Sequence, residues 1–235
     1  MKKLFILILV AASCKAVNSQ VLIAVLFGDK LNSGKLEFGL VVSPTLTNIT
    51  NSESDNRVGL NLSLFFNIWP ANKFSIRVEM SPKTAFGAKN ITPYSLGNDS
   101  LDHFFESGSV ERIIRTMNLT MLGRYSFSPH FFVDAGFQPD VLLKNAKDIF
   151  TADFNGSELQ YTQELKDRFT RLSFQFAAGL FYRFKPSIGS MGMGIRYVHG
   201  ITDIDKVLKG TQSNRAWQLN ISIPIGAVPK EKKSQ

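Results

Sequence analysis

The chain has a single cysteine, Cys14, and only three histidines among its 235 residues. Cys14 lies within the first part of the chain, which has the features of an export leader. Without another thiol, the mature chain has neither a disulfide scaffold nor a cysteine-based metal site. The histidines, His103, His130 and His199, show no metal-ligand spacing. We therefore expect no metal and no cofactor.

Long apolar runs are also missing, which argues against a helical membrane protein. The run Leu4–Ala12, of about nine residues, follows Lys2 and Lys3, and its length suits a signal peptide but not a membrane span. We predict a signal peptide over residues 1–19, cleaved before Gln20. An alternative interpretation takes Ala11 to Cys14 as a lipobox, in which Cys14 is lipidated. Both interpretations predict export.

Neither the charge nor any motif indicates an enzyme or a nucleic-acid-binding protein. The net charge is +8, but basic and acidic residues are interleaved, so we expect no nucleic-acid partner. Glycine-rich residues 189–194 lack the Lys-Ser/Thr that follows in a phosphate-binding loop. Asp203, Asp205 and His199 lie near an expected rim, where proteases of the omptin type have acidic and histidine residues, but they form no convincing catalytic set. We expect no catalytic activity.

The sequence does have a repeated alternation of apolar and polar residues. In one segment, Trp217 and Leu219 alternate with Gln218 and Asn220. A period of two is typical of β-strands with one apolar face. The pattern occurs in eight segments, residues 36–43, 58–66, 74–80, 115–125, 131–138, 172–184, 191–197 and 216–225.

The connections between these segments are alternately short and long. The short ones contain Pro, Asn or Gly, and the long ones are polar; they span residues 67–73, 126–130 and 185–190, and residues 44–57, 81–112, 139–170 and 199–215. This asymmetry is typical of bacterial outer-membrane barrels, in which the periplasmic turns are short and the external loops long. Within one long loop, residues 140–150 are a candidate for a short amphipathic helix.

We therefore predict an all-β fold, an eight-stranded antiparallel up-and-down transmembrane β-barrel over residues 35–226. Residues 20–34 form a periplasmic N-terminal segment in this prediction, and residues 227–235 form a polar periplasmic tail. Both termini are then periplasmic, in a protein of the bacterial outer membrane. A soluble barrel or a two-sheet sandwich would show the same alternation with the apolar face inside.

Charged residues on the polar face favour the membrane barrel. An Arg or Lys facing lipid at the bilayer midplane would cost about 2–4 kcal/mol. We therefore predict a charge network in the lumen, made of Glu37, Arg77, Glu79, Arg124, Asp134, Arg183 and Arg196. Glycines on the same face would relieve crowding in a narrow barrel.

Aromatic residues gather near the ends of the predicted strands, where the two membrane interfaces would lie. The predicted interface aromatics are Trp69, Phe74, Tyr125, Tyr182, Phe184, Tyr197 and Trp217.

The segment Gln20-Val21-Leu22-Ile23-Ala24-Val25-Leu26-Phe27-Gly28-Asp29-Lys30, continuing to Leu40, resembles the mature start of Bacteroidota outer-membrane β-barrel proteins of the PorT-like family. The family's barrel pattern covers roughly residues 20–226. The resemblance implies an outer-membrane barrel, and the family's namesake takes part in type IX protein secretion. The polar tail of this chain departs from the terminal aromatic residue that is common in outer-membrane barrels.

We expect a non-catalytic, structural or secretion-associated component of the cell envelope. The alternatives are a narrow channel or conduit for small solutes or apolar ligands, and a soluble exported lipid-binding barrel. The expected partners are outer-membrane lipid and lipopolysaccharide, together with envelope or secretion-system proteins that bind loops 81–112 and 139–170.

Overall fold

A computed structural model describes residues 36–208 and 210–225. The predicted signal peptide, the N-terminal segment and the tail from residue 226 lie outside the described residues, and so does Cys14. The ten strands and one helix of the described part are β1 Leu36–Ile49, β2 Asp55–Ala71, β3 Phe74–Ile91, α3 Asp99–Phe105, β4 Ser109–Ser126, β5 Phe131–Leu142, β6 Ala146–Phe154, β7 Ser157–Leu165, β8 Leu172–Arg183, β9 Gly192–Gly200 and β10 Asn214–Pro224.

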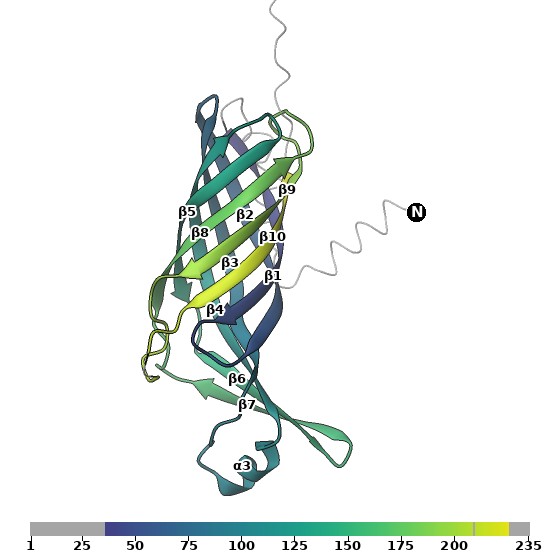
Figure 1. Cartoon of the computed structure of the whole chain (residues 1–235), viewed down its shortest axis with the longest axis vertical. Helices are drawn as coiled ribbons and strands as arrows, with labels where there is room; N and C mark the ends of the chain where they lie inside the picture. The colour runs from purple at the N-terminus through teal and green to yellow at the C-terminus, as the bar shows by residue number, and fades with distance from the viewer. Residues whose placement is uncertain (1–35, 209, 226–235) are drawn as a thin grey trace, which may run out of the picture.

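Eight of these strands close into an antiparallel barrel (Figure 1). Neighbouring strands follow the order β3-β2-β1-β10-β9-β8-β5-β4, and the pairing of β3 with β4 completes the ring. The eight segments with alternating residues each lie on one of these strands. The predicted eight-stranded barrel is therefore confirmed. No helix among the described residues is long and apolar enough to cross a membrane.

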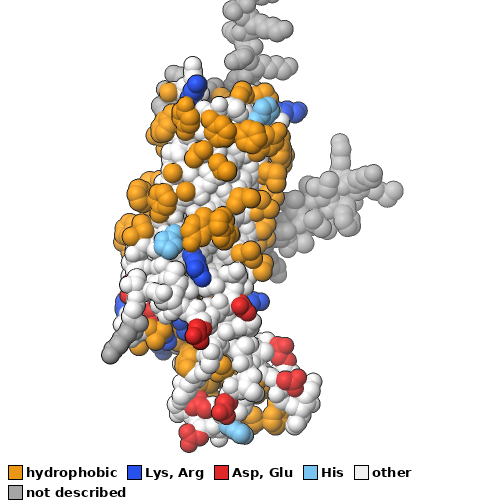
Figure 2. All heavy atoms as spheres, viewed as in Figure 1, with side chains coloured by type: hydrophobic (Ala, Val, Ile, Leu, Met, Phe, Trp, Pro, Cys, Tyr) orange, Lys and Arg blue, Asp and Glu red, His pale blue; other side chains and the backbone are white. Residues whose placement is uncertain are grey.

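The alternation along each strand separates an outer apolar face from an inner polar face. On β8 the outward Leu180 is 62% exposed, whereas the inward Gln175 is 1% exposed. Figure 2 shows the hydrophobic side chains that cover the barrel on the face in view. A soluble barrel has the opposite arrangement, because it buries its apolar face inside.

The two ends of the barrel differ. At one end, which we call the turn end, short connections join β2 to β3, β4 to β5 and β8 to β9. At the other, the loop end, β6, β7 and α3 form a small extension beyond the barrel (Figure 1). β6 pairs with the first residues of β4, from Ser109 to Ile113, and with β7. Helix α3 begins after Asn98, whose side chain accepts hydrogen bonds from two backbone amides of the first turn.

The helix suggested for residues 140–150 was wrong. These residues contain the end of β5, a short connection and the start of β6. Ala146, Asp148 and Phe150 are buried in alternation with less buried neighbours, which is the period of a strand. The free edge of β4 beyond the barrel supplies the backbone hydrogen bonds that make this segment a strand.

Candidate functional site

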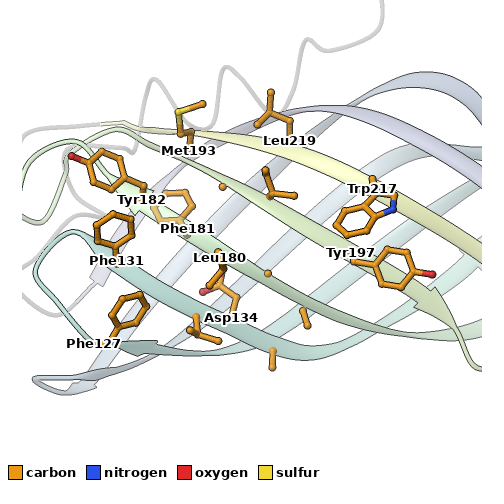
Figure 3. A pocket seen from close by; sticks show the side chains of 16 residues that line it. Phe127, Phe131, Asp134, Leu180, Phe181, Tyr182, Met193, Tyr197, Trp217 and Leu219 are labelled. Atoms are coloured by element: carbon orange, nitrogen blue, oxygen red, sulfur yellow. The ribbon is translucent and has the colours of Figure 1, made fainter.

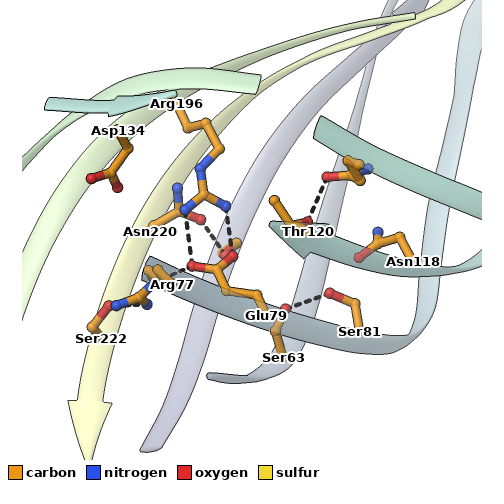
Figure 4. A network of polar contacts seen from close by, with 12 residues as sticks. Ser63, Arg77, Glu79, Ser81, Asn118, Thr120, Asp134, Arg196, Asn220 and Ser222 are labelled. Carbon is orange, nitrogen blue, oxygen red and sulfur yellow. Dashed lines mark hydrogen bonds and ion pairs between the residues drawn. The ribbon is translucent and has the colours of Figure 1, made fainter. Parts of the chain in front are cut away.

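The centre of the barrel contains a buried ion triad of Arg77, Glu79 and Arg196 (Figure 4). Arg196 donates to both Glu79 carboxylate oxygens at 2.6 and 2.9 Å, and Arg77 Nε donates to the same carboxylate. Arg77 also donates to Ser222 Oγ on β10 at 2.8 Å. All three charged side chains are at most 4% exposed as residues. Bonds to charged groups in such surroundings are stronger than neutral ones.

A second buried ion pair joins Arg124 to Asp134. The two residues lie opposite each other on β4 and β5. Nε and Nη2 of Arg124 each donate to one carboxylate oxygen of Asp134 at 2.7 Å. This two-bond geometry fixes the plane of the guanidinium group.

The third pair closes the turn end. Arg183 Nη2 lies 3.5 Å from Glu37 Oε2. The other Glu37 oxygen accepts from the backbone amide of Gly189, in the β8–β9 connection, at 2.7 Å. Asn67 donates to the same carboxylate at 2.5 Å. Glu37 therefore connects three separate strands and a turn.

Inward aromatic rings cover the arginine planes. The Arg77 guanidinium carbon lies 4.1 Å from the centre of the Phe65 ring, and that of Arg124 lies 4.4 Å from Phe181. Arg183 lies 4.8 Å from Phe132. Nη1 of Arg124 has no hydrogen-bond partner among the described residues, so its ring contacts supply part of its stabilisation.

Glycines on the inner face make room for these rings. A Cβ at Gly39 would lie 2.6 Å from the Phe65 ring, and one at Gly192 would lie 2.6 Å from the Phe181 ring. The same Cβ atoms would also lie 2.4 Å from the Ile223 carbonyl oxygen and 2.5 Å from that of Tyr182, so a larger residue would strain both the ring and the neighbouring strand. The inner glycines therefore accommodate the aromatic layer.

The structure brings the seven charged residues of the expected lumen network together inside the barrel, in the contacts given above. Sequence reasoning missed their aromatic neighbours Phe65, Phe132 and Phe181. The available signal was their position, because each lies in phase with the polar face of its strand.

The prediction that Trp69 lies at the membrane interface was wrong. Its ring lies 6.2 Å from that of Phe132 and 5.0 Å from the Arg183 guanidinium carbon, so it faces the lumen at the turn end. Trp69 is in phase with the inward Phe65 and Asn67 on β2, and that phase determines its side. The other predicted interface residues, Phe74, Tyr125, Tyr182, Phe184, Tyr197 and Trp217, are exposed or half-buried on the outer face.

The rest of the lumen is filled by two further layers. Hydroxyl and amide side chains pair in the middle of the barrel, as in Ser43 with Asn220 at 2.6 Å and Thr120 with Gln138 at 2.9 Å. Towards the loop end, a buried apolar cluster contains Ile49, Phe86, Ile114, Ala177, Val198 and Ala216. It shares the lumen with Asp140, which accepts a hydrogen bond from Gln138 at 3.0 Å. Around Glu37, Arg77 and Arg183, the side chains leave no gap that would hold a water molecule.

A separate ion cluster joins the loops at the loop end. Arg112 donates to both oxygens of Asp148 at 2.8 and 2.6 Å, and Arg168 Nη2 lies 2.9 Å from Asp205. Although burial raises the pKa of Asp205, hydrogen bonds from Arg168 and two backbone amides lower it below the usual range. Burial and the Asp148 carboxylate raise the pKa of Tyr94 to about 12.

The loop-end residues weighed as a protease-like set do not meet. Asp205 is buried against Arg168, and the Asp203 carboxylate accepts a hydrogen bond from the backbone N–H of Gln212 at 3.0 Å. His199 lies on the outer face, where its ring contacts Tyr197. Within residues 36–208 and 210–225, no group of three or more acidic or histidine side chains has a metal-binding arrangement.

Comparison with known protein families identifies the class of this barrel. The family described as outer membrane protein beta-barrel domain matches residues 27–206. The chain belongs to this family. It is therefore a β-barrel protein of the bacterial outer membrane. No curated protein matches the sequence.

Several solved outer-membrane barrels are similar in structure but distant in sequence. Ail, the attachment invasion locus protein of Yersinia pestis, has 9% identity and a TM-score of 0.46, with 82% of this chain and 99% of Ail covered. OprG from Pseudomonas aeruginosa has 12% identity and a TM-score of 0.41, with 83% and 98% covered. The outer membrane enzyme PagL has 10% identity and a TM-score of 0.37, with 79% and 99% covered. At this distance, the likenesses say nothing about function.

Proposed function

We propose that this outer-membrane barrel is a sealed, non-catalytic component of the envelope, with a structural or secretion-associated role. The observation that carries the proposal is the filled lumen. Three buried ion pairs, an aromatic layer and an apolar layer occupy it from the turn end to the loop end. A small barrel whose interior is packed with side chains holds its strands together without providing a path.

The packing argues against the alternative of a narrow channel. A solute path through the turn end would need to separate Glu37 from Arg183 and to displace the rings of Phe65 and Phe181. Removing one partner from a buried ion pair costs about 3–5 kcal/mol. Spontaneous opening is therefore rare in this proposal.

The absence of a catalytic role is likewise part of the proposal. Of the buried acids of the lumen, Glu37, Glu79 and Asp134 are each held by an arginine. Asp140 accepts hydrogen bonds from the side-chain amides of Gln138 and Gln175 instead. Each of these carboxylates is therefore occupied by partners from the barrel itself. The histidines lie apart from these acids, so no acid–base pair forms.

In the proposed orientation, the turn end and both termini lie in the periplasm and the loop end lies outside. External loops are free to vary while the barrel is constrained, so the extension of β6, β7 and α3 is the proposed surface for envelope or secretion-system proteins. The resemblance of residues 20–40 to PorT-like proteins supports the secretion-associated role, and membership of that family is proposed on this resemblance alone.

Surface labelling tests the orientation. In a Cys14→Ser background, Ser107→Cys places a thiol beyond α3 and Lys185→Cys places one in the β8–β9 turn; both positions are exposed. A membrane-impermeant maleimide should label Ser107→Cys on intact cells, and should label Lys185→Cys only after the envelope is permeabilised. The reverse pattern would overturn the proposed orientation.

The same cells test the membrane location and the secretion-associated role. The protein should stay in the membrane fraction until detergent is added, and recovery in the aqueous fraction would refute a membrane barrel. Purification from the native envelope should retain partner proteins that are lost when residues 145–166 are replaced by a short glycine linker. Unchanged partners after this replacement would exclude the extension as their binding surface.

A further inference from the structure

The outer surface of the barrel has a groove on one side, formed by β5, β8, β9 and β10 (Figure 3). Its volume is about 940 Å³, and its lining is almost wholly apolar. Ala135 and Ala178 face outward within it, whereas the register partner of Ala178 on β9 is the much larger Tyr197. Ala135 and Ala178 lie opposite each other in the β5–β8 register, so the wall is thin across two adjacent strands.

Aromatic side chains stand at both ends of this groove. Phe127, Phe131 and Tyr182 lie at its turn end, and Tyr197 and Trp217 lie at its loop end (Figure 3). The Tyr197 and Trp217 rings are 4.8 Å apart. The groove therefore runs along the direction in which lipid chains lie and ends near the level of an aromatic girdle.

Two polar side chains continue the groove beyond the loop-end rim. Arg215 and His199 lie two residues beyond Trp217 and Tyr197 on the same faces of β10 and β9, about 7 Å further along each strand. They lie opposite each other in register, and both are exposed. His199 Nδ1 is 3.3 Å from the Tyr197 hydroxyl. No acidic side chain among the described residues forms an ion pair with Arg215.

An unpaired arginine directly above an apolar groove matches an amphipathic anion. Arginine binds phosphate oxygens with its planar fork of donors. Figure 2 shows basic and histidine side chains at the border where the apolar band ends. The acyl part of a lipid would fill the groove, while its phosphate would lie at the membrane surface beside Arg215.

We propose that this groove is a binding site for one phosphate-bearing lipid of the outer leaflet, with an acyl chain over Ala135 and Ala178 and the phosphate on Arg215 and His199. The inference rests on the proposed orientation, because only then does the loop end meet the outer leaflet. It goes beyond a general lipid coat, since it assigns one lipid to one place on the barrel.

Native mass spectrometry of the detergent-solubilised full chain tests this site. The probes are diphosphoryl lipid A and the same lipid after removal of its phosphates. We expect one diphosphoryl lipid A to be retained, with about tenfold weaker retention in Arg215→Gln, the loss expected for one charge-assisted phosphate contact. Ala178→Phe, which fills the groove from the lipid side, should weaken retention of both probes.

Arg115→Gln is the matched control. Arg115 also faces outward and forms no ion pair among the described residues, but it lies on β4, across the barrel from β10. Equal loss in Arg115→Gln and Arg215→Gln, or no loss in Ala178→Phe, would mean general coating by lipid and would overturn the site. The mass spectrometry is done in detergent and does not depend on the orientation in the membrane. A negative result would therefore reject the lipid site without affecting the maleimide labelling, which tests the orientation.

Discussion

Arg196 and Glu79 form a two-bond ion pair across the barrel, although their strands, β9 and β3, lie on opposite sides of the ring. Backbone hydrogen bonds join only adjacent strands. The Arg196–Glu79 pair therefore adds a cross-connection that the sheet itself does not have. Arg77 extends it to β10 through Ser222.

Replacing Arg196 with leucine should lower the free energy of unfolding by about 3 kcal/mol, because a buried carboxylate loses one of its two cations. Glu79→Leu should cost more, since both Arg77 and Arg196 then lose their acid. Denaturation in urea, followed by heat-modifiable gel mobility, measures both changes. The control is Lys147→Ala, in the exposed pair of Lys147 with Glu164, which should change stability by less than about 1 kcal/mol. Wild-type stability in Arg196→Leu would argue against the cross-connection.

Arg124→Lys should destabilise the barrel by about 1–3 kcal/mol, although it keeps the positive charge. Lysine cannot form the paired bonds to Asp134 or cover the Phe181 ring as a planar group. The same denaturation assay measures the change, and Arg115→Lys on the outer face of β4 is the control. If the two substitutions have equal effects, the planar geometry of Arg124 contributes nothing.

The two tryptophans should respond differently to lipid. Trp217 is 55% exposed on the outer face, whereas Trp69 packs on Phe132 and Arg183 inside the barrel. Each single variant keeps one tryptophan, and both are placed in vesicles of brominated phospholipid, which quenches fluorescence on contact. The Trp69→Phe variant keeps Trp217, and its fluorescence should be quenched. The Trp217→Phe variant keeps Trp69, and its fluorescence should persist. Equal quenching would place Trp69 at the lipid surface, as its residue type alone suggested.

Tyr94 should titrate near pH 12, about two pH units above an ordinary tyrosine. The raised pKa means that the folded loop end favours the neutral phenol. The stabilisation from Tyr94 is complete below about pH 10 and is lost as the pH rises towards 12. Ultraviolet difference titration against Tyr94→Phe isolates its signal among the five tyrosines. Asp148→Asn should bring the midpoint down, and an unchanged midpoint would remove Asp148 as a cause.

The eight barrel strands were predictable because membrane and lumen impose opposite environments on alternate residues. The same alternation places the seven lumen charges on one face. For Trp69 the prediction failed, because residues 67–73 were taken as a turn and the residue type suggested the interface. The strand β2 continues to Ala71, and its alternation turns Trp69 inward, in phase with Asn67. In a β-barrel, the position of a residue in the alternation predicts its side better than its residue type does, because one step along the strand moves a side chain to the other face.

The β6–β7 hairpin and the loop-end ion cluster could not be predicted in the same way. β6 becomes a strand only because β4 extends beyond the barrel and offers a free edge. Arg112, Asp148 and Asp205 are far apart in the sequence and meet only when the loops pack. Neither feature leaves a periodic signal, since each depends on contacts between segments.

The sealed lumen is the central claim, and conductance across a planar lipid bilayer tests it most directly. The full chain, reconstituted and shown to be folded by its heat-modifiable mobility, should give no steady conductance steps. A variant that opens the turn end, Glu37→Ala combined with Phe65→Ala, should give brief openings and serves as the positive comparison. Stable open steps from the wild-type barrel would contradict the account, because ions would then pass through a lumen that Glu37, Arg77 and Phe65 are proposed to close.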